Sequence, residues 1–350
     1  MGVLDIALLG LGAIGREHAR VLRANPQLRL AAVADPGAGA AALCAQWQVP
    51  HYPDLASLLA GCRVDGVVLA TPNTQHVEQT LQCLERGLPV LLEKPIAHSV
   101  SEAQRLVAHL DAHGGQVLIG HHRAHSAILA AALEILQTGS LGDLVCVLGS
   151  ATFYKPDDYF AQASWRREPG AGPILINLIH EVHTLRMLCG EIEEVQAMTS
   201  TRRRGFAVED TASISLRFAS GALGSFMLSD VAASARSWEQ TSGENPAYAH
   251  YPDEDCYVLS GTRGSLNVPT LRTKVYGDAL PSWFTPFRQA QSPCAHWDPL
   301  ERQMAHFAEL VQGRVAPRVS ARDGLMNLQV VDAIARAARS GATVRPTECH

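Results

Sequence analysis

Three glycines near the start of the chain, Gly10, Gly12 and Gly15, have the spacing of a loop that binds a dinucleotide. The first glycine of such a loop permits a tight turn, the second lets the backbone approach a pyrophosphate, and the third allows a helix to pack closely on a strand. Ala13 and Ile14 lie where the free amide groups of a helix N-terminus would face the phosphates. A glycine turn without a ligand is the alternative interpretation.

An acidic residue follows the glycine loop at the distance that such a site requires. Asp35 lies 20 residues after Gly15, at the end of the second predicted strand. Its carboxylate would accept hydrogen bonds from both hydroxyls of an adenosine ribose and would repel a 2′-phosphate. Because Pro36-Gly37 offers no adjacent basic residue, the sequence predicts NAD as the cofactor, with NADP less favoured.

A polar loop, Thr71-Pro-Asn-Thr-Gln-His76, follows a predicted strand over residues 64–70. Doubly wound sheets bind their ligands at the carboxyl ends of the strands. The loop therefore supplies four candidate contacts to the cofactor, namely Thr71, Pro72, Asn73 and His76. A proline turn in which Thr74 caps the next helix is the alternative, and both interpretations can hold.

Glu93-Lys94-Pro95 follows the next predicted strand, residues 89–92, so these side chains should reach the same crevice. A lysine beside a nicotinamide could bind a substrate hydroxyl and relay its proton. Glu93 and Lys94 are therefore candidate cofactor contacts, and Lys94 is also a candidate catalytic and substrate-binding residue. A surface lysine beside a turn is the alternative.

Two histidines flank a glutamate in the stretch ILINLIHEVHTL, residues 174–185. His180 and His183 would share one face of a helix, which is compatible with a metal site, an acid/base residue or polar side chains on a buried helix. The zinc motif H-E-x-x-H spaces its histidines by four residues, and here the interval is three. No metal is therefore predicted, although His121, His122 and His125 could add ligands.

These loops and helices fall into two predicted domains. Over residues 1–122 short apolar strands alternate with amphipathic helices, which predicts an α/β Rossmann domain with a doubly wound parallel sheet. Residues 123–350 predict an α+β domain with an open mixed or antiparallel sheet. Its expected elements are a helix at 126–138, strands at 143–154, a helix at 174–185, strands between 195 and 276, a long loop at 277–297 and helices at 299–312 and 321–339.

Composition narrows the class of protein. The 350 residues are 47% hydrophobic and carry a net charge of −5, which gives no reason to expect nucleic acid or an anionic membrane as a partner. Eight cysteines occur without a C-x-x-C pair, and Cys44, Cys83 and Cys189 are expected to fill core positions on helices. No signal peptide opens the chain and no apolar run approaches the roughly 20 residues of a membrane span, so we expect a cytoplasmic protein.

The combined motifs resemble the glucose–fructose oxidoreductase/inositol dehydrogenase (Gfo/Idh/MocA) family over nearly the whole chain. The resemblance comprises the glycine loop, Asp35, Thr-Pro-Asn-x-x-His, Glu-Lys-Pro, Gly120-His-His-Arg123, Trp165-Arg166, the helix with His180 and the closing helix that contains DGLMNLQVVDAI. It implies NAD(P)-dependent oxidation of an alcohol carbon on a sugar, a sugar acid or a cyclic polyol. It also implies homodimers or homotetramers.

The resemblance assigns roles to individual residues. Lys94 would be the catalytic lysine, and His180 the acid/base residue that faces the substrate. Arg123 would contact cofactor or substrate. The substrate-binding residues would be Lys94, Arg123, Trp165, Arg166, Asn177 and His180.

The chain also departs from the family pattern. Many relatives carry aspartates four residues before this histidine and three after it, where Ile176 and His183 stand here. Asn177 is polar but lies about 100° of helix away from the first of these positions. An inositol-type substrate therefore does not carry over, and Lys155 with Arg123 and Arg166 could favour a carboxylated one.

Three other functions stay open at this stage. The protein could bind NAD(P) without turnover, as a sensor or regulatory scaffold. It could keep its cofactor bound for transient redox within a hydrolase-like or epimerising cycle. It could also oxidise a non-sugar alcohol such as a dihydrodiol.

Overall fold

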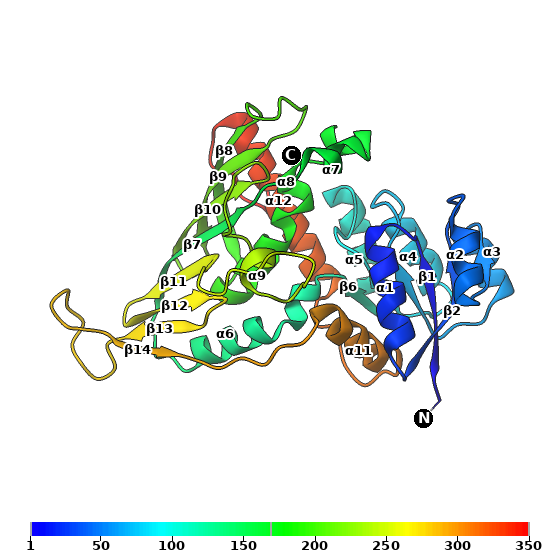
Figure 1. Cartoon of the computed structure of the whole chain (residues 1–350), viewed down its shortest axis with the longest axis horizontal. Helices are drawn as coiled ribbons and strands as arrows, with labels where there is room; N and C mark the ends of the chain where they lie inside the picture. Colours follow the sequence, from blue (N-terminus) through cyan, green and yellow to red (C-terminus); the bar gives the residue numbers. More distant parts are fainter. Residues whose placement is uncertain (1, 169, 349–350) are drawn as a thin grey trace. The chain divides into compact units, whose positions relative to one another are not determined.

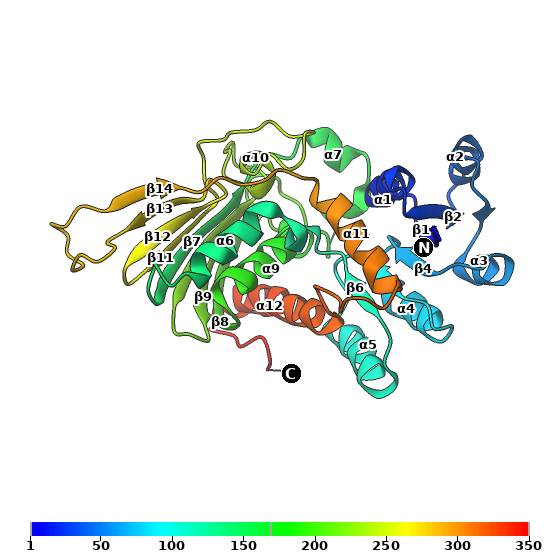
Figure 2. The same ribbon diagram turned by 90° about the horizontal axis from the view of Figure 1, so that it is seen from below.

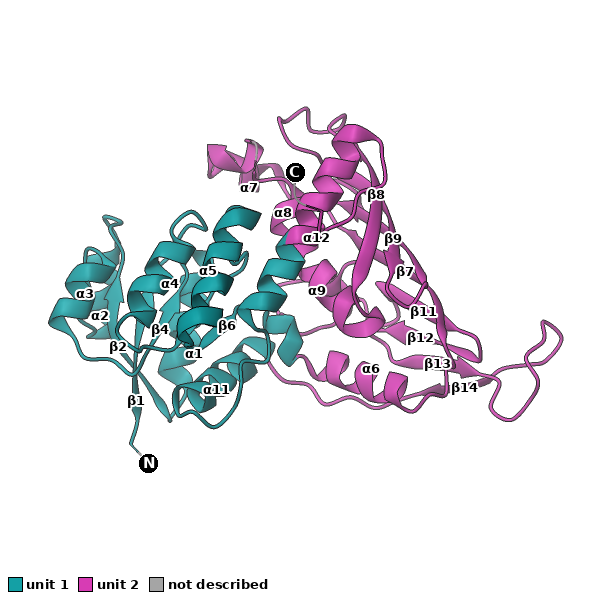
Figure 3. Cartoon of the chain, turned by 180° about the vertical axis from the view of Figure 1, so that it is seen from behind, with its two compact units in different colours: residues 1–125, 299–328 teal, residues 126–298, 329–350 magenta. Residues whose placement is uncertain are grey.

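The computed structural model describes residues 2–168 and 170–348 (Figure 1). Pro169 and Cys349 therefore lie outside the described residues. The chain divides into two compact units, which Figure 3 colours separately. Unit 1 comprises the residues up to 125 together with 299–328, and unit 2 comprises 126–298 and the residues from 329 onward.

Unit 1 is built on a parallel sheet of six strands in the order β3-β2-β1-β4-β5-β6. Its strands are β1 (Leu4–Leu9), β2 (Leu28–Ala34), β3 (His51–Tyr52), β4 (Gly66–Leu69), β5 (Val90–Leu92) and β6 (Val117–Ile119). Its helices are α1 (Ala13–Ala24), α2 (Ala40–Trp47), α3 (Leu55–Gly61), α4 (His76–Leu84), α5 (Val100–His113), the 3₁₀ turn η1 (His122–His125) and α11 (Pro299–Val311). The strand order reverses between β1 and β4, which confirms the predicted doubly wound sheet.

The apolar strands of unit 1 explain this arrangement. Every residue of β4 and β5 is buried, as continuous rather than alternating apolarity predicts for a sheet that is covered on both faces. Helix α1 packs on β1 and β2, and α4 packs on β4 and β5. The loops that leave β1, β4 and β5 therefore emerge at one edge of a rigid sheet.

Unit 2 contains a mixed sheet of eight strands in the order β14-β13-β12-β11-β7-β10-β9-β8. Its strands are β7 (Leu144–Thr152), β8 (Ile192–Ser200), β9 (Thr211–Phe218), β10 (Leu223–Ser229), β11 (Tyr257–Gly261), β12 (Gly264–Val268), β13 (Arg272–Val275) and β14 (Arg288–Gln291). Its helices are α6 (Ala127–Gln137), α7 (Asp157–Ala161), the 3₁₀ turn η2 (Ser164–Arg167), α8 (Pro173–Ile176), α9 (Leu178–Cys189) and α10 (Trp238–Thr241). Only β7 and β10 pair in parallel, which confirms the predicted mixed sheet.

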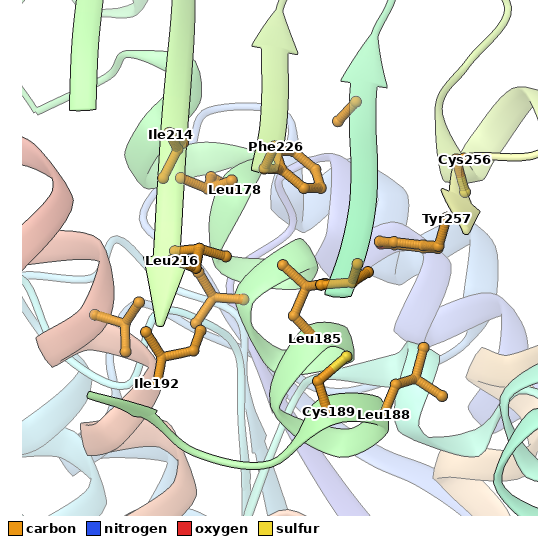
Figure 4. Close-up of a cluster of buried hydrophobic side chains, with 14 of the residues drawn as sticks. Leu178, Leu185, Leu188, Cys189, Ile192, Ile214, Leu216, Phe226, Cys256 and Tyr257 are labelled. Atoms are coloured by element: carbon orange, nitrogen blue, oxygen red, sulfur yellow. The ribbon is translucent and has the colours of Figure 1, made fainter. Parts of the chain in front are cut away.

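Helices cover one face of the unit 2 sheet. Helices α6 and α9 lie on this face (Figure 2), together with the second half of α12 (Ala321–Ser340), a helix that runs through both units. Leu178 and Leu185 of α9 point toward Leu216 and Phe226 on the strands (Figure 4). Each such buried side chain contributes roughly 1.5–3 kcal/mol relative to an exposed one. Because α9 is buried on almost all sides, the polar side chains that it carries lie within the protein core.

Several predicted elements differ from the structure. Residues 299–328 pack with unit 1, where α11 contacts α1 and η1, rather than with the second domain. The predicted loop at 277–297 contains strand β14 at the sheet edge. The helix predicted at 174–185 is divided at Asn177 into α8 and α9. Helix α4 begins at His76 after Gln75, so Thr74 does not cap it.

The described cysteines are free thiols. Cys44, Cys83 and Cys189 are buried, as predicted, and burial raises the pKa of the Cys83 and Cys189 thiols to about 12. They act as small apolar side chains rather than nucleophiles. Among the residues that the structure describes, no helix combines the length and apolarity needed to cross a membrane.

Candidate active site

The glycine loop after β1 requires glycine at its first and third positions. Gly10 has a φ of +87°, and a Cβ there would collide with the carbonyl oxygen of Ala70 at the end of β4. A Cβ at Gly15 would collide with the carbonyl oxygen of Gly10. Glycine at these two positions therefore lets the loop fold tightly against the neighbouring strand.

Gly12, the middle glycine, faces open space and is not required by the packing of the loop itself. A Cβ at Gly12 would meet no atom within 4 Å, so the fold itself does not require glycine there. Gly12 precedes α1, and its neighbours Ala13 and Ile14 are exposed. The first turn of α1 holds no acidic residue. This open helix N-terminus fits the pyrophosphate of a dinucleotide, whose charge the backbone amides would bind.

Asp35 lies at the carboxyl end of β2, beside the glycine loop. Its Oδ2 accepts the backbone N–H of Leu11 at 2.6 Å, and its Oδ1 accepts that of Gly37 at 2.6 Å. A carboxylate offers about four acceptor sites, so the two backbone bonds orient Asp35 without exhausting it. The position fits the ribose contact that the sequence predicts.

The loop after β4 is held by His76, whose ring is turned inward and is 1% exposed. Its Nε2 lies 2.8 Å from the carbonyl oxygen of Thr71, and its Nδ1 lies 2.8 Å from that of Pro95. Burial lowers the pKa of His76, and the two carbonyl groups only partly oppose this shift. The ring therefore links the Thr71 loop to the Lys94 loop, while Pro72 and Asn73 remain at least partly exposed.

Glu93 supports the loop that carries Lys94. Its carboxylate is 4% exposed, accepts Nε2–H of His18 at 2.8 Å and accepts the backbone N–H of Lys94 at 3.1 Å. A Cβ at Gly120 would lie 2.8 Å from this carboxylate, so glycine there makes room for it. Burial alone would raise the pKa of Glu93, but the hydrogen bond from His18 and nearby positive charges hold it below its usual value. Lys94 itself is half-buried at the carboxyl end of β5.

The Gly120-His-His-Arg123 segment leads from β6 into η1. His121 accepts the Nδ2–H of Asn327 at 3.1 Å, and the ring of His125 lies 5.2 Å from that of His306. The Arg123 side chain is buried within unit 1. Within residues 2–168 and 170–348, no group of three or more His, Cys, Asp or Glu side chains has the arrangement of a metal site.

In unit 2 the break between α8 and α9 determines where the predicted substrate residues lie. Asn177 occupies the break, and the backbone N–H of His180 donates to its carbonyl oxygen at 3.1 Å. The Asn177 side chain accepts the Nζ–H of Lys155 at 2.8 Å. Asn177 and His180 are thus one turn apart, and His180 is 9% exposed.

Trp165 and Arg166 lie on η2, near the same break, because the Tyr159 ring contacts both the Arg166 guanidinium and, at 5.2 Å, the Lys155 ammonium. Trp165 is 56% exposed. The Arg166 guanidinium lies 3.9 Å from the centroid of the Tyr159 ring and donates to the Tyr159 carbonyl oxygen. Arg166 therefore braces the segment around α7, a role that the sequence did not distinguish from substrate binding.

Sequence reasoning missed several polar partners. One is the pairing of His18, a histidine on the apolar face of α1, with Glu93. Another is the pairing of Glu181 with Tyr257, whose buried hydroxyl donates to the Glu181 carboxylate. A polar residue within an apolar helical face was the available signal for His18. Nothing in the local pattern indicates that Tyr257 lies against Glu181.

Comparison with known proteins identifies relatives of both parts of the chain. A family model described as an oxidoreductase family with an NAD-binding Rossmann fold matches residues 4–121, and a model of the GFO/IDH/MocA C-terminal domain matches residues 129–267. The rhizopine catabolism protein MocA of Rhizobium meliloti is 28% identical over 58% of this chain, which spans 62% of that protein's length. Inositol 2-dehydrogenase of Rubrobacter xylanophilus is 28% identical over 97% of this chain and 92% of its own.

A solved structure gives the same fold. The WlbA dehydrogenase of Chromobacterium violaceum, in complex with NADH and UDP-GlcNAcA, superposes with a TM-score of 0.79 at 25% identity. The match covers 100% of this chain and 98% of that one.

Proposed function

Because the chain belongs to the GFO/IDH/MocA family of NAD-binding oxidoreductases, we propose that it oxidises a CH–OH carbon of a sugar, a sugar acid or a cyclic polyol. Family membership confirms the predicted resemblance, the enzymatic class and NAD as the cofactor. The observation that carries the substrate proposal is the position of Lys94, at the carboxyl end of β5 beside the loop of the neighbouring strand β4.

The residues at the carboxyl ends of the strands of unit 1 would hold NAD. The amides around Gly12, Ala13 and Ile14 would bind the pyrophosphate, and Asp35 would bind the adenosine ribose. Thr71, Pro72 and Asn73 would border the nicotinamide. When bound, the nicotinamide supplies the acceptor for a hydride from the substrate carbon.

Lys94 and His180 would together remove the proton of the substrate hydroxyl. The ammonium of Lys94 would bind the oxygen and stabilise the charge that develops there. His180 would accept the proton, because an imidazole with a reference pKa of about 6.5 is a competent base at neutral pH. Trp165, Arg166 and Asn177 would orient the remainder of the substrate, and the buried Arg123 would act through its neighbours.

His76 and Glu93 would act through their neighbours, because their side chains are 1% and 4% exposed. Both were predicted from the sequence as cofactor contacts. We propose instead that His76 couples the Thr71 loop to the Lys94 loop, and that Glu93 fixes the backbone of Lys94.

A substrate panel tests the proposed activity. Sugars, sugar acids, inositols and dihydrodiols are offered with NAD or NADP, and nicotinamide absorbance is followed. We expect NADH from at least one polyhydroxylated substrate, with NAD preferred. Tight binding of NAD without turnover of any substrate would instead favour a sensor, and interconversion of substrates without net NADH would favour a retained cofactor.

Two variants test the catalytic residues on a substrate found in this way. Lys94→Met should lower kcat by roughly 100-fold or more while the protein still binds NAD, and His180→Asn should also lower kcat strongly. Lys274→Met, which removes an exposed lysine on β13, is the matched control. Full activity of Lys94→Met would exclude the proposed role.

We also propose that the protein forms a homodimer or homotetramer through the outer face of the unit 2 sheet. The strand register aligns Met198, Met227 and Leu148 on this face with serines and few charged residues, and all three are exposed. Such an exposed surface with apolar side chains and few charges suits a second copy of the chain. Light scattering should give an oligomer, and Leu148→Lys should shift it toward the monomer.

A further inference from the structure

Lys155, whose side chain is largely but not fully buried, contacts the polar side chain of Asn177 at the break between α8 and α9. Lys155 follows β7, and its backbone N–H donates to the carbonyl oxygen of Asp230 at 2.8 Å. Its Nζ lies 2.8 Å from Oδ1 of Asn177 and 3.5 Å from Oδ2 of Asp230. Only 13% of the Lys155 side chain and 3% of the Asp230 side chain are exposed. The ion pair with Asp230 therefore restrains the Lys155 ammonium in its position beside Asn177.

The chemistry of the contact determines which way the Asn177 amide faces. An ammonium group has three donors and no acceptor, so only the amide oxygen of Asn177 can face Lys155. The amide nitrogen lies on the other branch of the side chain, with its two N–H donors directed away from Lys155. Among the residues that the structure describes, the Asn177 side chain makes no other hydrogen bond. The two N–H donors of Asn177 are therefore available to a ligand, while Lys155 occupies one of the two acceptor sites of the amide oxygen.

The donors lie next to the proposed acid/base residue. His180 follows Asn177 by three residues, and its backbone N–H bonds to the Asn177 carbonyl, so the two side chains emerge on the same side of the chain. Any substrate that reaches His180 would also meet the Asn177 amide. In the family pattern, the aspartates around this histidine would instead accept hydrogen bonds from substrate hydroxyls. In this chain those positions hold Ile176 and His183.

We propose that Lys155 fixes Asn177 as a hydrogen-bond donor, and that this subsite recognises a carboxylate on the substrate. The inference rests on the proposed function and deepens it. It predicts that sugar acids are preferred over the matching neutral sugars or alditols.

Both cations and carboxylates surround Lys155, and the buried carboxylate of Asp210 accepts the backbone N–H of Arg204 at 3.0 Å. Lys155 and Arg204 share the single carboxylate of Asp230, with Arg204 Nε at 2.9 Å. Asp157 also pairs with Arg204, but its side chain is 89% exposed, so water screens it. Glu209 lies in the same region, where its Oε1 accepts the backbone N–H of Ile174 at 2.8 Å and burial raises the pKa of its carboxyl.

Ligand binding to the NADH-loaded protein tests the inference without turnover. Glucuronate, galacturonate and gluconate are compared with glucose, galactose and sorbitol by isothermal titration calorimetry. We expect at least one acid to bind roughly tenfold more tightly than its neutral partner, as hydrogen bonds to a charged group predict. Asn177→Asp should remove or reverse this preference, because it replaces two donors by a negative charge. Asn245→Asp, at an exposed position of unit 2, should leave the preference unchanged.

Lys155→Met separates orientation from simple stability. This variant leaves Asn177 in place but free to rotate, so acids and neutral ligands should bind with similar, weaker affinity. A loss of structure alone would weaken all ligands in proportion and leave the ratio unchanged.

The outcomes are distinct from those of the activity panel. Equal binding of acids and neutral ligands by the native protein, no binding of any acid, or an unchanged ratio in Asn177→Asp would each overturn the carboxylate subsite. The proposed oxidoreductase activity would still stand if a neutral polyol is oxidised. Conversely, selective binding of acids without turnover would support the subsite and contradict the dehydrogenase.

Discussion

Replacing His18 by leucine should destabilise the protein, because it removes a hydrogen bond from the buried carboxylate of Glu93. His18 is fully buried on α1 and donates a hydrogen bond to the Glu93 carboxylate at 2.8 Å, while the Lys94 backbone N–H donates another at 3.1 Å. Leucine fills the space but donates no hydrogen bond. Glu93 would then remain buried without the His18 hydrogen bond that helps to stabilise its charge.

The expected loss follows from the burial of both partners. Removing one partner of a buried charged hydrogen bond costs about 3 kcal/mol, because the remaining group cannot be solvated. For a unit of this size, each kcal/mol shifts the melting temperature by roughly 2–4 °C. His18→Leu should therefore melt roughly 6–12 °C below the native protein at pH 7.

A double variant tests whether the unpaired Glu93 carboxylate causes the lower melting temperature of His18→Leu. His18→Leu combined with Glu93→Met removes the carboxylate as well, so it should melt higher than His18→Leu alone. His98→Leu, at an exposed position in unit 1, is the control and should change stability little. Thermal unfolding by circular dichroism measures all four proteins. A double variant that is less stable than the single one would refute this reasoning.

The change of stability with pH provides a second test of the same prediction. In the native protein the pKa of Glu93 is held below 4.5, so its contribution to stability is present above that pH and is lost as pH falls further. Without His18, burial should raise the pKa of Glu93 above its unfolded value. The variant should then gain stability relative to the native protein as pH falls from about 7 toward 4.5.

Three further predictions concern the cofactor site. Gly12→Ala should raise the KM for NAD by roughly tenfold without changing the melting temperature, whereas Gly15→Ala should lower the melting temperature because its Cβ collides with backbone. Asp35→Asn keeps the side-chain shape but removes the charge, so the ratio of kcat/KM for NADP to that for NAD should rise by about tenfold; an unchanged ratio would contradict the ribose assignment. Burial lowers the pKa of His76 below 6.5, so the folded protein loses stability as pH falls below that value. His76→Gln should show a shallower loss in melting temperature between pH 6.5 and about pH 5 than the native protein.

The sequence predicts the first unit well because local pattern and global fold agree there. The continuous apolar strand at 66–69 can be stable only between two layers of helices, and the glycines at 10 and 15 are compatible with few structures other than a tight strand-to-helix turn. These signals lie within a few residues of one another. The parallel sheet and the glycine loop therefore follow from short stretches of sequence.

The elements that the sequence misplaces depend on distant partners. The strand at 288–291 has four exposed side chains without apolar alternation, so only its backbone pairing with 272–275 defines it. The helix at 299–311 has an apolar face, but periodicity does not reveal which core that face joins. The choice depends on the contacts of Phe307 and Val311 with Gly66, far away in the sequence.

The candidate site is divided in the same way. Gly10, Gly12, Gly15 and Asp35 form a motif with fixed spacing, so sequence alone locates them. His18 lies 75 residues from Glu93, and Lys155 lies 22 residues from Asn177, so these pairs exist only after folding. The catalytic assignments of Lys94 and His180 stay predictions from the family pattern.

The same division explains why the substrate is the hardest property to predict. At Ile176 and His183 the chain lacks the acceptor carboxylates of the family pattern, and a local comparison shows only that something is missing. The structure shows that Lys155, which is not part of this motif, donates from its ammonium to the Asn177 amide oxygen at 2.8 Å, next to Ile176. A donor amide that is fixed by a cation has the opposite hydrogen-bonding polarity to an aspartate. If this polarity decides the substrate, relatives in which a lysine occupies the position of Lys155 and asparagine that of Asn177 should also select acids, whatever their overall identity to this chain.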